Sequence, residues 1–321
     1  MKTLRFSNWS TFAWYGVRLS VPGDWNPGQL TGEAGSGNAR LDDAEMVRLE
    51  VEWKDAHGDT NVSDLLDRYT EGLVKEASKK KRPLQLERHV PLEGLQVQGV
   101  ESAEHFAWAN GIHVYALAGY SQASDRLLFL RVMGRPNEDL SSLLPTIFNS
   151  LTDTPRDSSK LWSLYDSRAI SPAGYAIDTY ELKSGHIRLR FAEGKRQLQF
   201  DRLSLGKSLL KNQSLAEWFD AFYQKDNRHS NLDVTETEWL ACNAVEFTGS
   251  PKGKLRALLQ PLPFWNTQPA LFFSGRAWFN EETNKIHVVK ALWKNGVEPP
   301  DLDAACRSVV SGEPDAQPLE V

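Results

Sequence analysis

The feature that most constrains the fold is an order of hydrophobic periodicities that occurs twice along the 321-residue chain. Each half opens with strand-like segments, as at 47–53 and 187–191, where apolar and charged residues alternate with a period of two. Each half continues with an amphipathic helical stripe, at 65–73 and 215–222, then with further apolar strands and a closing helical stripe. This common order favours an internal duplication.

Short segments of the two halves also align in the same order. The sequence VPGDW at 21–25 matches SPAGY at 171–175, and GNARL at 37–41 matches GHIRL at 185–189. Each match is generic alone, but their shared order and nearly constant offset support the duplication.

Strands joined by short turns rather than by helical crossovers predict antiparallel sheets packed by helices, which is an α+β fold. A polar, proline-containing break lies near the middle of the chain. We therefore predict two tandem domains of the same α+β fold, at 1–152 and 161–310. The segment between them, 153–160, is predicted to be a linker, and 311–321 a disordered tail.

The pattern resembles the PsbP-like fold group. The resemblance rests on an opening strand that ends in proline plus an aromatic residue (21–25 and 171–175), a charged alternating strand, a helix with a Ser or Asn start, further strands and a closing helix. The group includes PsbP of photosystem II, a Ran-binding import factor, the DcrB lipoproteins and effector-associated chaperones of type VI secretion. The resemblance implies a tandem PsbP-like fold in a group that mostly lacks enzymes, and it transfers no binding residue to this chain.

Composition excludes several classes of protein. A net charge of −5 and a pI near 5.9 argue against a nucleic-acid binder that works by neutralising phosphates. The only cysteines, Cys242 and Cys306, are too few for a disulfide scaffold and lie in apolar surroundings, so buried free thiols are expected. No run approaches the about 18 apolar residues that cross a bilayer. We expect a soluble, cytoplasmic protein without membrane insertion.

No segment carries a catalytic or cofactor motif, and we expect no cofactor. The best metal-like cluster is Asp55-x-His57-x-Asp59, whose alternating positions would present oxygen and imidazole ligands together. It lies in a glycine-containing turn, where Asp and Gly are simply good turn formers, so we predict no metal. His105 and His113 flank the turn formed by Asn110 and Gly111, and are predicted to face each other across a hairpin.

The hydrophobic periodicities also predict which residues form the core, and a capping motif predicts where one helix starts. Ser214 followed three residues later by Glu217 is typical of a capping box. The residues predicted to be buried are Val51, Trp53, Leu65, Tyr69, Leu144, Phe148, Phe200, Trp218, Phe222 and Val289.

The absence of catalytic and cofactor motifs and the surplus of aromatic residues, with 11 tryptophans, favour a non-enzymatic protein-binding module. Such a module would be an adaptor, a chaperone or a scaffold subunit. The candidate partner contacts are Phe264 and Trp265, in a proline-rich loop that would be stiff, and the pair Trp278 and Phe279. Two alternatives stay open: an enzyme or small-ligand binder that uses an inter-domain cleft, and a chain in which one half stabilises the other.

Overall fold

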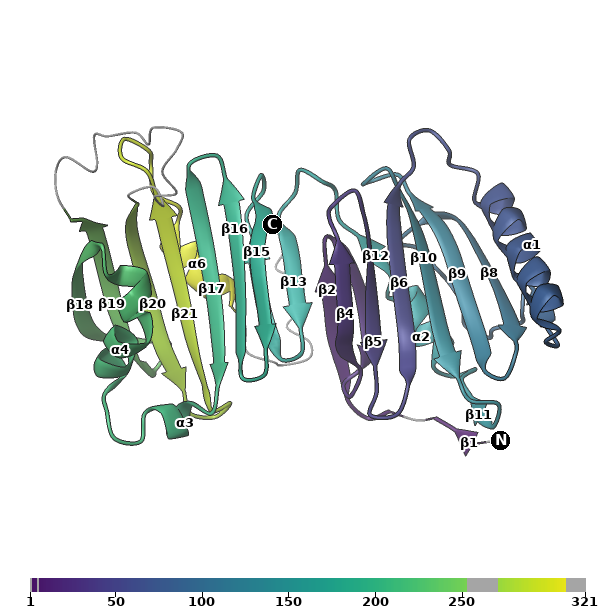
Figure 1. Ribbon diagram of the computed structural model, residues 1–321, viewed down its shortest axis with the longest axis horizontal. Helices are drawn as coiled ribbons and strands as arrows, with labels where there is room; N and C mark the ends of the chain where they lie inside the picture. Colours follow the sequence, from purple (N-terminus) through teal and green to yellow (C-terminus); the bar gives the residue numbers. More distant parts are fainter. Residues whose placement is uncertain (1, 5, 253–270, 310–321) are drawn as a thin grey trace. The chain divides into compact units, whose positions relative to one another are not determined.

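The computed structural model describes residues 2–4, 6–252 and 271–309 (Figure 1). The described residues are mostly strands, arranged in antiparallel sheets with few helices. They divide into two compact units between Asp166 and Ser167. The predicted tail at 311–321 and the candidate contacts Phe264 and Trp265 lie outside the described residues.

The first unit is built on a seven-stranded antiparallel sheet. Its first three strands follow one another in chain order, and its last four follow in reverse order. The strands, from edge to edge, are β4 (Asn26–Gly32), β5 (Ser36–Asp42), β6 (Val47–Asp55), β10 (Arg126–Gly134), β9 (His113–Ser121), β8 (Glu101–Ala109) and β7 (Gln85–Arg88).

Helix α1 (Val62–Lys80) packs over β8 and β9. It begins because the Asn61 side chain accepts a hydrogen bond from the Asp64 amide, which satisfies one of the free donors of the first turn. Its buried face carries Val62, Leu66 and Thr70.

The predictions for Leu65 and Tyr69 were wrong, since both are half-buried. Tyr69 still packs against the sheet, with its ring centroid 4.8 Å from that of Phe129, while its hydroxyl accepts a hydrogen bond from Arg131 at 3.3 Å.

Four strands of this unit belong to a second, five-stranded antiparallel sheet, in the order β12 (Thr152–Asp153), β3 (Val17–Pro22), β2 (Trp9–Trp14) and β13 (Lys160–Leu164). The predicted linker therefore starts inside a strand, where Asp153 is buried in an ion pair with Arg126. Helix α2 (Leu144–Asn149) packs against β3, and β1 (Lys2–Thr3) pairs in parallel with β11 (Glu138–Asp139).

The second unit repeats the strand order of the first. Three strands in chain order are followed by four in reverse. They are β15 (Ala176–Lys183), β16 (His186–Glu193), β17 (Arg196–Ser204), β21 (Lys285–Trp293), β20 (Phe272–Asn280), β19 (Cys242–Pro251) and β18 (Ser230–Trp239).

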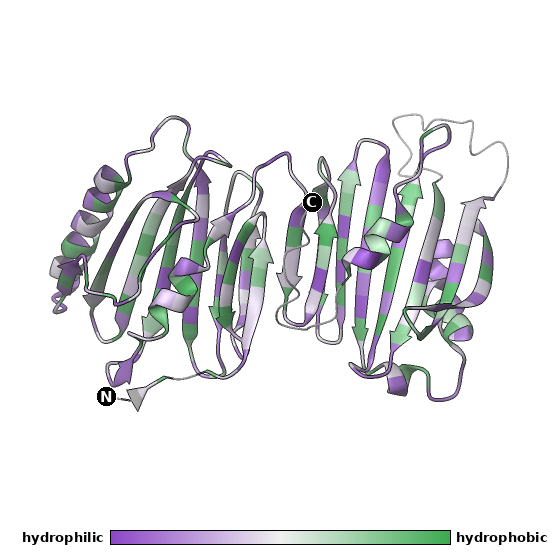
Figure 2. Cartoon of the chain, turned by 180° about the vertical axis from the view of Figure 1, so that it is seen from behind, coloured by the Kyte–Doolittle hydropathy of each residue, from purple (hydrophilic) through white to green (hydrophobic). Residues whose placement is uncertain are grey.

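Helices cover both faces of this sheet. Helix α4 (Leu215–Asn227) packs on β18, β19 and β20, and α3 (Gly206–Leu209) follows the end of β17. Helix α6 (Leu302–Ser308) lies on the opposite face, against β14 (Ser167–Ser171), β20 and β21 (Figure 2).

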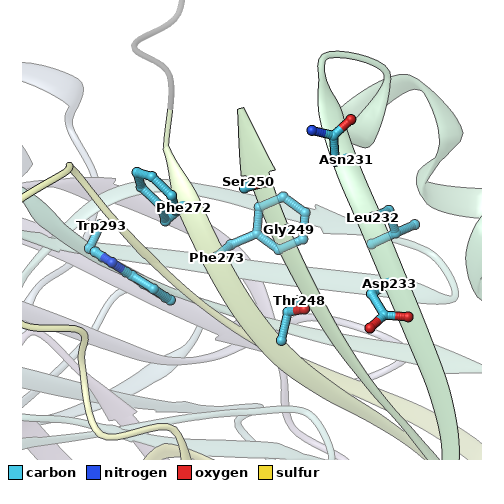
Figure 3. Close-up of a pocket in the computed structure, with 9 residues that line it drawn as sticks. All are labelled: Asn231, Leu232, Asp233, Thr248, Gly249, Ser250, Phe272, Phe273 and Trp293. Atoms are coloured by element: carbon cyan, nitrogen blue, oxygen red, sulfur yellow. The ribbon is translucent and has the colours of Figure 1, made fainter. Parts of the chain in front are cut away.

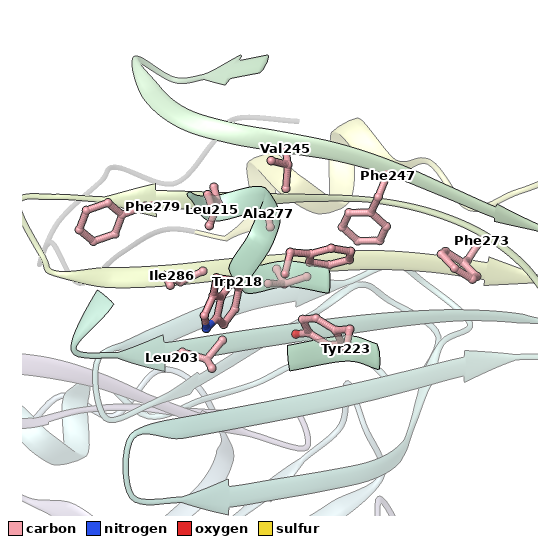
Figure 4. Packing of buried hydrophobic residues seen from close by; sticks show 12 residues of the cluster. Leu203, Leu215, Trp218, Tyr223, Val245, Phe247, Phe273, Ala277, Phe279 and Ile286 are labelled. Carbon is pink, nitrogen blue, oxygen red and sulfur yellow. The ribbon is translucent and has the colours of Figure 1, made fainter. Parts of the chain in front are cut away.

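Helix α4 starts with the predicted capping box: the Ser214 hydroxyl accepts from the Glu217 amide, and the Glu217 carboxylate accepts from the Ser214 amide. Figure 4 shows Trp218 and Tyr223 packed among strand residues, including Phe247. Phe222 was predicted to be buried but is 41% exposed. Because α4 sits over β18 to β20, the flank that carries Phe222 faces the part of the sheet that the helix leaves uncovered.

The remaining core predictions are confirmed, since Val51, Trp53, Leu144, Phe148, Phe200, Trp218 and Val289 are all buried. The prediction that His105 and His113 face each other across the hairpin was wrong. The β8–β9 register places His113 opposite Ala109 and His105 opposite Leu117, and the His105 ring lies instead 6.1 Å from the ring of His89. Among the described helices, none is long and apolar enough to span a membrane.

Candidate functional site

The two seven-stranded sheets have four edges, and β18 differs from the other three. The edge strand β7 has only four residues, and the registers of β4 and β15 are interrupted at Pro27/Gln29 and Ile177/Thr179. Short strands and bulges protect an edge from pairing with another chain. In contrast, the ten residues of β18 pair with β19 in one unbroken register.

The register also identifies which backbone groups of β18 point outward. Pairs in an antiparallel ladder alternate between hydrogen-bonded and non-hydrogen-bonded. The Lys252 amide donates to the His229 carbonyl at 2.9 Å, which makes this a bonded pair. The next pair, Ser230 with Pro251, is non-bonded, in keeping with the missing amide hydrogen of proline.

The alternation continues along the strand. The backbone N–H and C=O groups that point away from β19 are therefore those of Ser230, Leu232, Val234, Glu236 and Glu238. Among the described residues, no other segment hydrogen-bonds to these groups. As far as the described residues go, the outer edge of β18 is thus an unpaired row of donors and acceptors.

Strand β18 is also acidic. Asp233, Glu236 and Glu238 are exposed, and the strand contains no lysine or arginine. Within the described part of the chain, none of the three carboxylates forms an ion pair. Glu236 and Glu238 lie on the face of the sheet that carries α4, because they share the parity of Leu232 and Val234, which pack against the core cluster there. Asp233 points to the other face.

A hollow of about 420 Å³ opens beside Asp233 (Figure 3). By strand parity, the lining side chains on the face opposite α4 are Asn231, Asp233, Thr248, Ser250, Phe272 and Trp293. The rings of Phe272 and Trp293 are stacked, with centroids 6.4 Å apart and planes inclined by 21°. The hollow thus combines a carboxylate with aromatic surface.

The turn that joins β18 to β19 is strained. Both central residues have positive φ, 49° at Leu240 and 58° at Ala241. Two-residue hairpin turns of this kind favour Asn and Gly, since a side chain at positive φ clashes with the backbone. Leu240 is nevertheless 69% exposed, so this strained turn presents an apolar side chain to solvent.

The base of the same hairpin is held firmly. The Arg276 guanidinium lies 3.9 Å from the centre of the Trp239 ring. Arg276 also pairs with Glu246, and with Asp303 of α6 at 3.0 Å. These contacts fix the start of the turn on the α6 face of the sheet.

A second polar cluster lies under α4. The buried Asp201 carboxylate accepts hydrogen bonds from Tyr223 Oη at 2.9 Å, Gln199 Nε2 at 2.6 Å and Arg188 Nε at 2.6 Å. His186 Nε2 lies 2.7 Å from the same carboxylate. Burial alone would raise the pKa of Asp201, but the hydrogen bonds and charges of His186 and Arg188 outweigh it and hold the pKa below its usual range.

Lys290 completes this cluster. Its Nζ lies 2.9 Å from Asn227 Oδ1 and 3.6 Å from the centre of the Phe273 ring. Burial lowers the pKa of Lys290 to about 8. Perturbed pKa values gather at functional sites but also in structural networks. The Asp201 carboxyl has no exposed surface, and its hydrogen bond from Tyr223 fixes α4 to the sheet.

The first unit has a matching row of charged groups. Arg131 pairs across strands with Glu50, as Lys290 does with Gln199, and Glu52 takes the register position of Asp201. Tyr69 of α1 contacts this row, as Tyr223 of α4 does in the second unit. The shared arrangement supports a structural role.

The described candidate contacts from the sequence are packed inside the second unit. Trp278 is 4% exposed and stacks on His287, with ring centroids 5.3 Å apart. Phe279 is 8% exposed and belongs to the core cluster beneath α4. The other two, Phe264 and Trp265, lie outside the described residues.

Asp55, His57 and Asp59, the metal-like cluster of the sequence, do not converge on a common site. Asp55 hydrogen-bonds to Arg156, with 3.2 Å between Oδ2 and Nη1, whereas Asp59 pairs with Arg68 at 3.1 Å. His57 is exposed, with a φ of 49°. Over residues 2–4, 6–252 and 271–309, no group of three or more His, Cys, Asp or Glu side chains is placed to hold a metal ion.

Comparisons with known proteins identify no family. No family model and no curated protein matches the chain. Among solved structures, the apo form of the type VI secretion (T6SS) immunity protein TplEi from Pseudomonas aeruginosa aligns with 94% of this chain and 97% of its own. The sequence identity is 12% and the TM-score 0.30. The function is therefore inferred from the geometry of this chain itself.

Proposed function

We propose that this chain is a protein-binding module that receives an extended segment of a partner protein as an added strand along β18. The observation that carries the proposal is the open, unbroken ten-residue edge of β18. In strand addition, main-chain hydrogen bonds supply affinity, and pockets for alternate side chains supply specificity. Such a module serves as an adaptor, a chaperone or an assembly subunit.

The edge offers five residues whose N–H and C=O groups point outward. Each backbone hydrogen bond contributes about 1 kcal/mol net, and ordering the partner segment offsets part of this gain. Side-chain contacts must therefore add to the binding. The hollow beside Asp233 and the exposed Leu240 flank the edge near its two ends and are available for such contacts.

We further propose that the two halves are tandem copies of one α+β domain of PsbP-like type, at about 1–152 and 161–310. The identical strand order of the two seven-stranded sheets supports this. In both units a tyrosine of the helix hydrogen-bonds to a charged side chain of the sheet, Arg131 for Tyr69 and Asp201 for Tyr223, which is in keeping with a common arrangement. In this view the second copy keeps a long open edge where the first has the four-residue β7.

The test uses a proline at an outward-facing position. Glu236 lies in a non-bonded pair with Val245, so Glu236→Pro removes an outward N–H without breaking the ladder to β19. The matched control, Glu236→Ala, removes the same carboxylate but keeps the N–H. We expect a partner captured from the native source by the wild-type chain and by Glu236→Ala to be lost with Glu236→Pro.

Two further measurements keep this test decisive. Thermal melts establish that both variants fold, and Glu238→Pro with Glu238→Ala replaces the first pair if Glu236→Pro does not fold. Partner binding should also slow amide exchange at Leu232, Val234 and Glu236, whose N–H groups face outward. Equal retention of the partner by folded proline and alanine variants would contradict strand addition at β18.

A further inference from the structure

We infer that the segment received along β18 is basic, with three lysines or arginines in the order cation-x-cation-x-x-cation from its N-terminal end. This inference rests on the strand addition proposed above. It follows from the three carboxylates of β18, their placement on the two faces of the strand, and the hollow beside one of them.

The charge of the edge selects the partner. Asp233, Glu236 and Glu238 are exposed and form no ion pair within the described residues. A segment added along this edge brings its side chains to about 5 Å from those of β18, where opposite charges attract and like charges repel. A second copy of β18 would place carboxylates against carboxylates, so the acidic edge disfavours self-pairing and favours a basic strand.

The faces of the strand determine the spacing. Successive side chains of a strand point to opposite faces. Glu236 and Glu238 share the α4 face, whereas Asp233 points to the other face. Cations opposite these three residues must therefore be separated by two positions and then by three. The cation that pairs with Asp233 lies on the opposite face from the other two.

The direction follows from the sheet. Every neighbouring pair of strands in this sheet is antiparallel. An antiparallel addition meets Glu238 first and Asp233 last, which gives the stated order from the N-terminus of the partner segment.

The hollow favours a long cationic side chain opposite Asp233. The stacked rings of Phe272 and Trp293 line it together with the Asp233 carboxylate. Aromatic surface attracts a cation over its face and packs against an alkyl stem. Lysine and arginine combine such a stem with the charge that Asp233 needs.

The test uses three labelled ten-residue peptides of threonine and valine with lysines inserted. In the first, the lysines occupy the second, fourth and seventh positions. In the second, the third lysine is moved by one position, which places it on the wrong face at the same net charge. The third has glutamine in place of every lysine. We expect the first to bind about tenfold more tightly than the other two, and more weakly in high salt.

Variants of the protein assign the effect to the edge. The double variant Glu236→Gln/Glu238→Gln should lose most of the preference for the first peptide. Glu87→Gln/Glu93→Gln, which makes the same change in net charge at exposed residues of the first unit, should keep it. Glu236→Pro should abolish binding of the first peptide, whereas Glu236→Ala should only weaken it.

The outcomes separate the two proposals. Peptide binding that disappears in Glu236→Pro but is equal for the lysine and glutamine peptides overturns the basic segment and keeps strand addition. Binding that is unchanged in Glu236→Pro overturns strand addition itself. Equal binding of the first two peptides overturns the spacing. No binding of the first peptide at about 1 mM, a free energy near −4 kcal/mol, overturns the basic segment, whereas strand addition is decided by the capture test with Glu236→Pro.

Discussion

The hydroxyl of Tyr223 donates a hydrogen bond of 2.9 Å to the buried carboxylate of Asp201, which joins helix α4 to the centre of its sheet. In the first unit, Tyr69 of α1 also contacts its sheet, where its hydroxyl accepts a hydrogen bond from Arg131 at 3.3 Å. In each unit a helix tyrosine thus contacts a charged group on one of the two central strands. The two contacts differ in burial, because Tyr223 is 1% exposed whereas Tyr69 is half-buried.

This difference predicts unequal effects of the same substitution. Tyr223→Phe should lower the free energy of unfolding by about 1.5–3 kcal/mol, since it removes a donor from a buried charged acceptor. Tyr69→Phe should cost about 1 kcal/mol or less, because water can reach its partner. Urea melts of the two variants provide the comparison. Equal losses of stability would show that burial of the tyrosine hydroxyl and its charged partner does not decide the contribution.

The sequence predicts the elements that have local patterns. The alternation at 47–53 and 187–191 matches strands β6 and β16, and the capping box at Ser214 starts α4 as expected. The sequence pattern predicts less well how a helix is rotated about its axis, and so which of its residues are buried. Tyr69 and Phe222 lie at the margins of their stripes, and the position of the helix over the sheet determines how far each is buried.

The candidate site depends on relationships that local patterns do not carry. The open edge of β18 exists because the strand order ends there, and strand order is not encoded in periodicity. The hairpin turn gives no turn signal, because Leu240 and Ala241 replace the Asn and Gly that favour positive φ. The three acidic residues within 230–239 are visible in the sequence, but they mark a candidate binding edge only once the strand order is known.

Lys290 predicts a pH-dependent stability of the second unit. Burial lowers its pKa to about 8, whereas in the unfolded chain the pKa is about 10.4. At neutral pH both states are protonated, so the cost of burying the charge is fully present. Between pH 8 and 10.4 the unfolded state binds more protons than the folded state, and stability therefore rises with pH.

The measurement compares the wild type with Lys290→Met. Relative to the Met variant, the free energy of unfolding of the wild type should rise by about 3 kcal/mol between pH 8 and 10.4, as the lysine loses its charge. Burial raises the pKa of Cys306 to about 12 and lowers stability over part of the same range. That thiol is present in both proteins, so its effect cancels in the difference. A difference independent of pH would show that Lys290 is not buried as a charged group.

At the β18–β19 turn, we expect substitutions to change stability and partner binding independently of each other. Ala241→Gly relieves the strain at a φ of 58° and leaves the Leu240 side chain in place. We expect it to raise the free energy of unfolding by about 0.5–1 kcal/mol, because glycine adopts positive φ without a steric cost. The partner captured by the wild-type chain should be retained.

Leu240→Asn addresses the other half of this prediction. Asparagine tolerates the φ of 49° better than leucine does, so the variant should be at least as stable as the wild type. It also removes the apolar side chain, which is 69% exposed at the tip of the hairpin. If Leu240 contacts the partner, Leu240→Asn should weaken capture while Ala241→Gly does not, although neither variant destabilises the fold. Thermal melts and capture measured on the same preparations provide both values. If Leu240→Asn captures the partner as well as the wild type does, the binding surface is restricted to the β18 edge and the hollow beside Asp233. The positive φ angles at this turn would then have no role in binding.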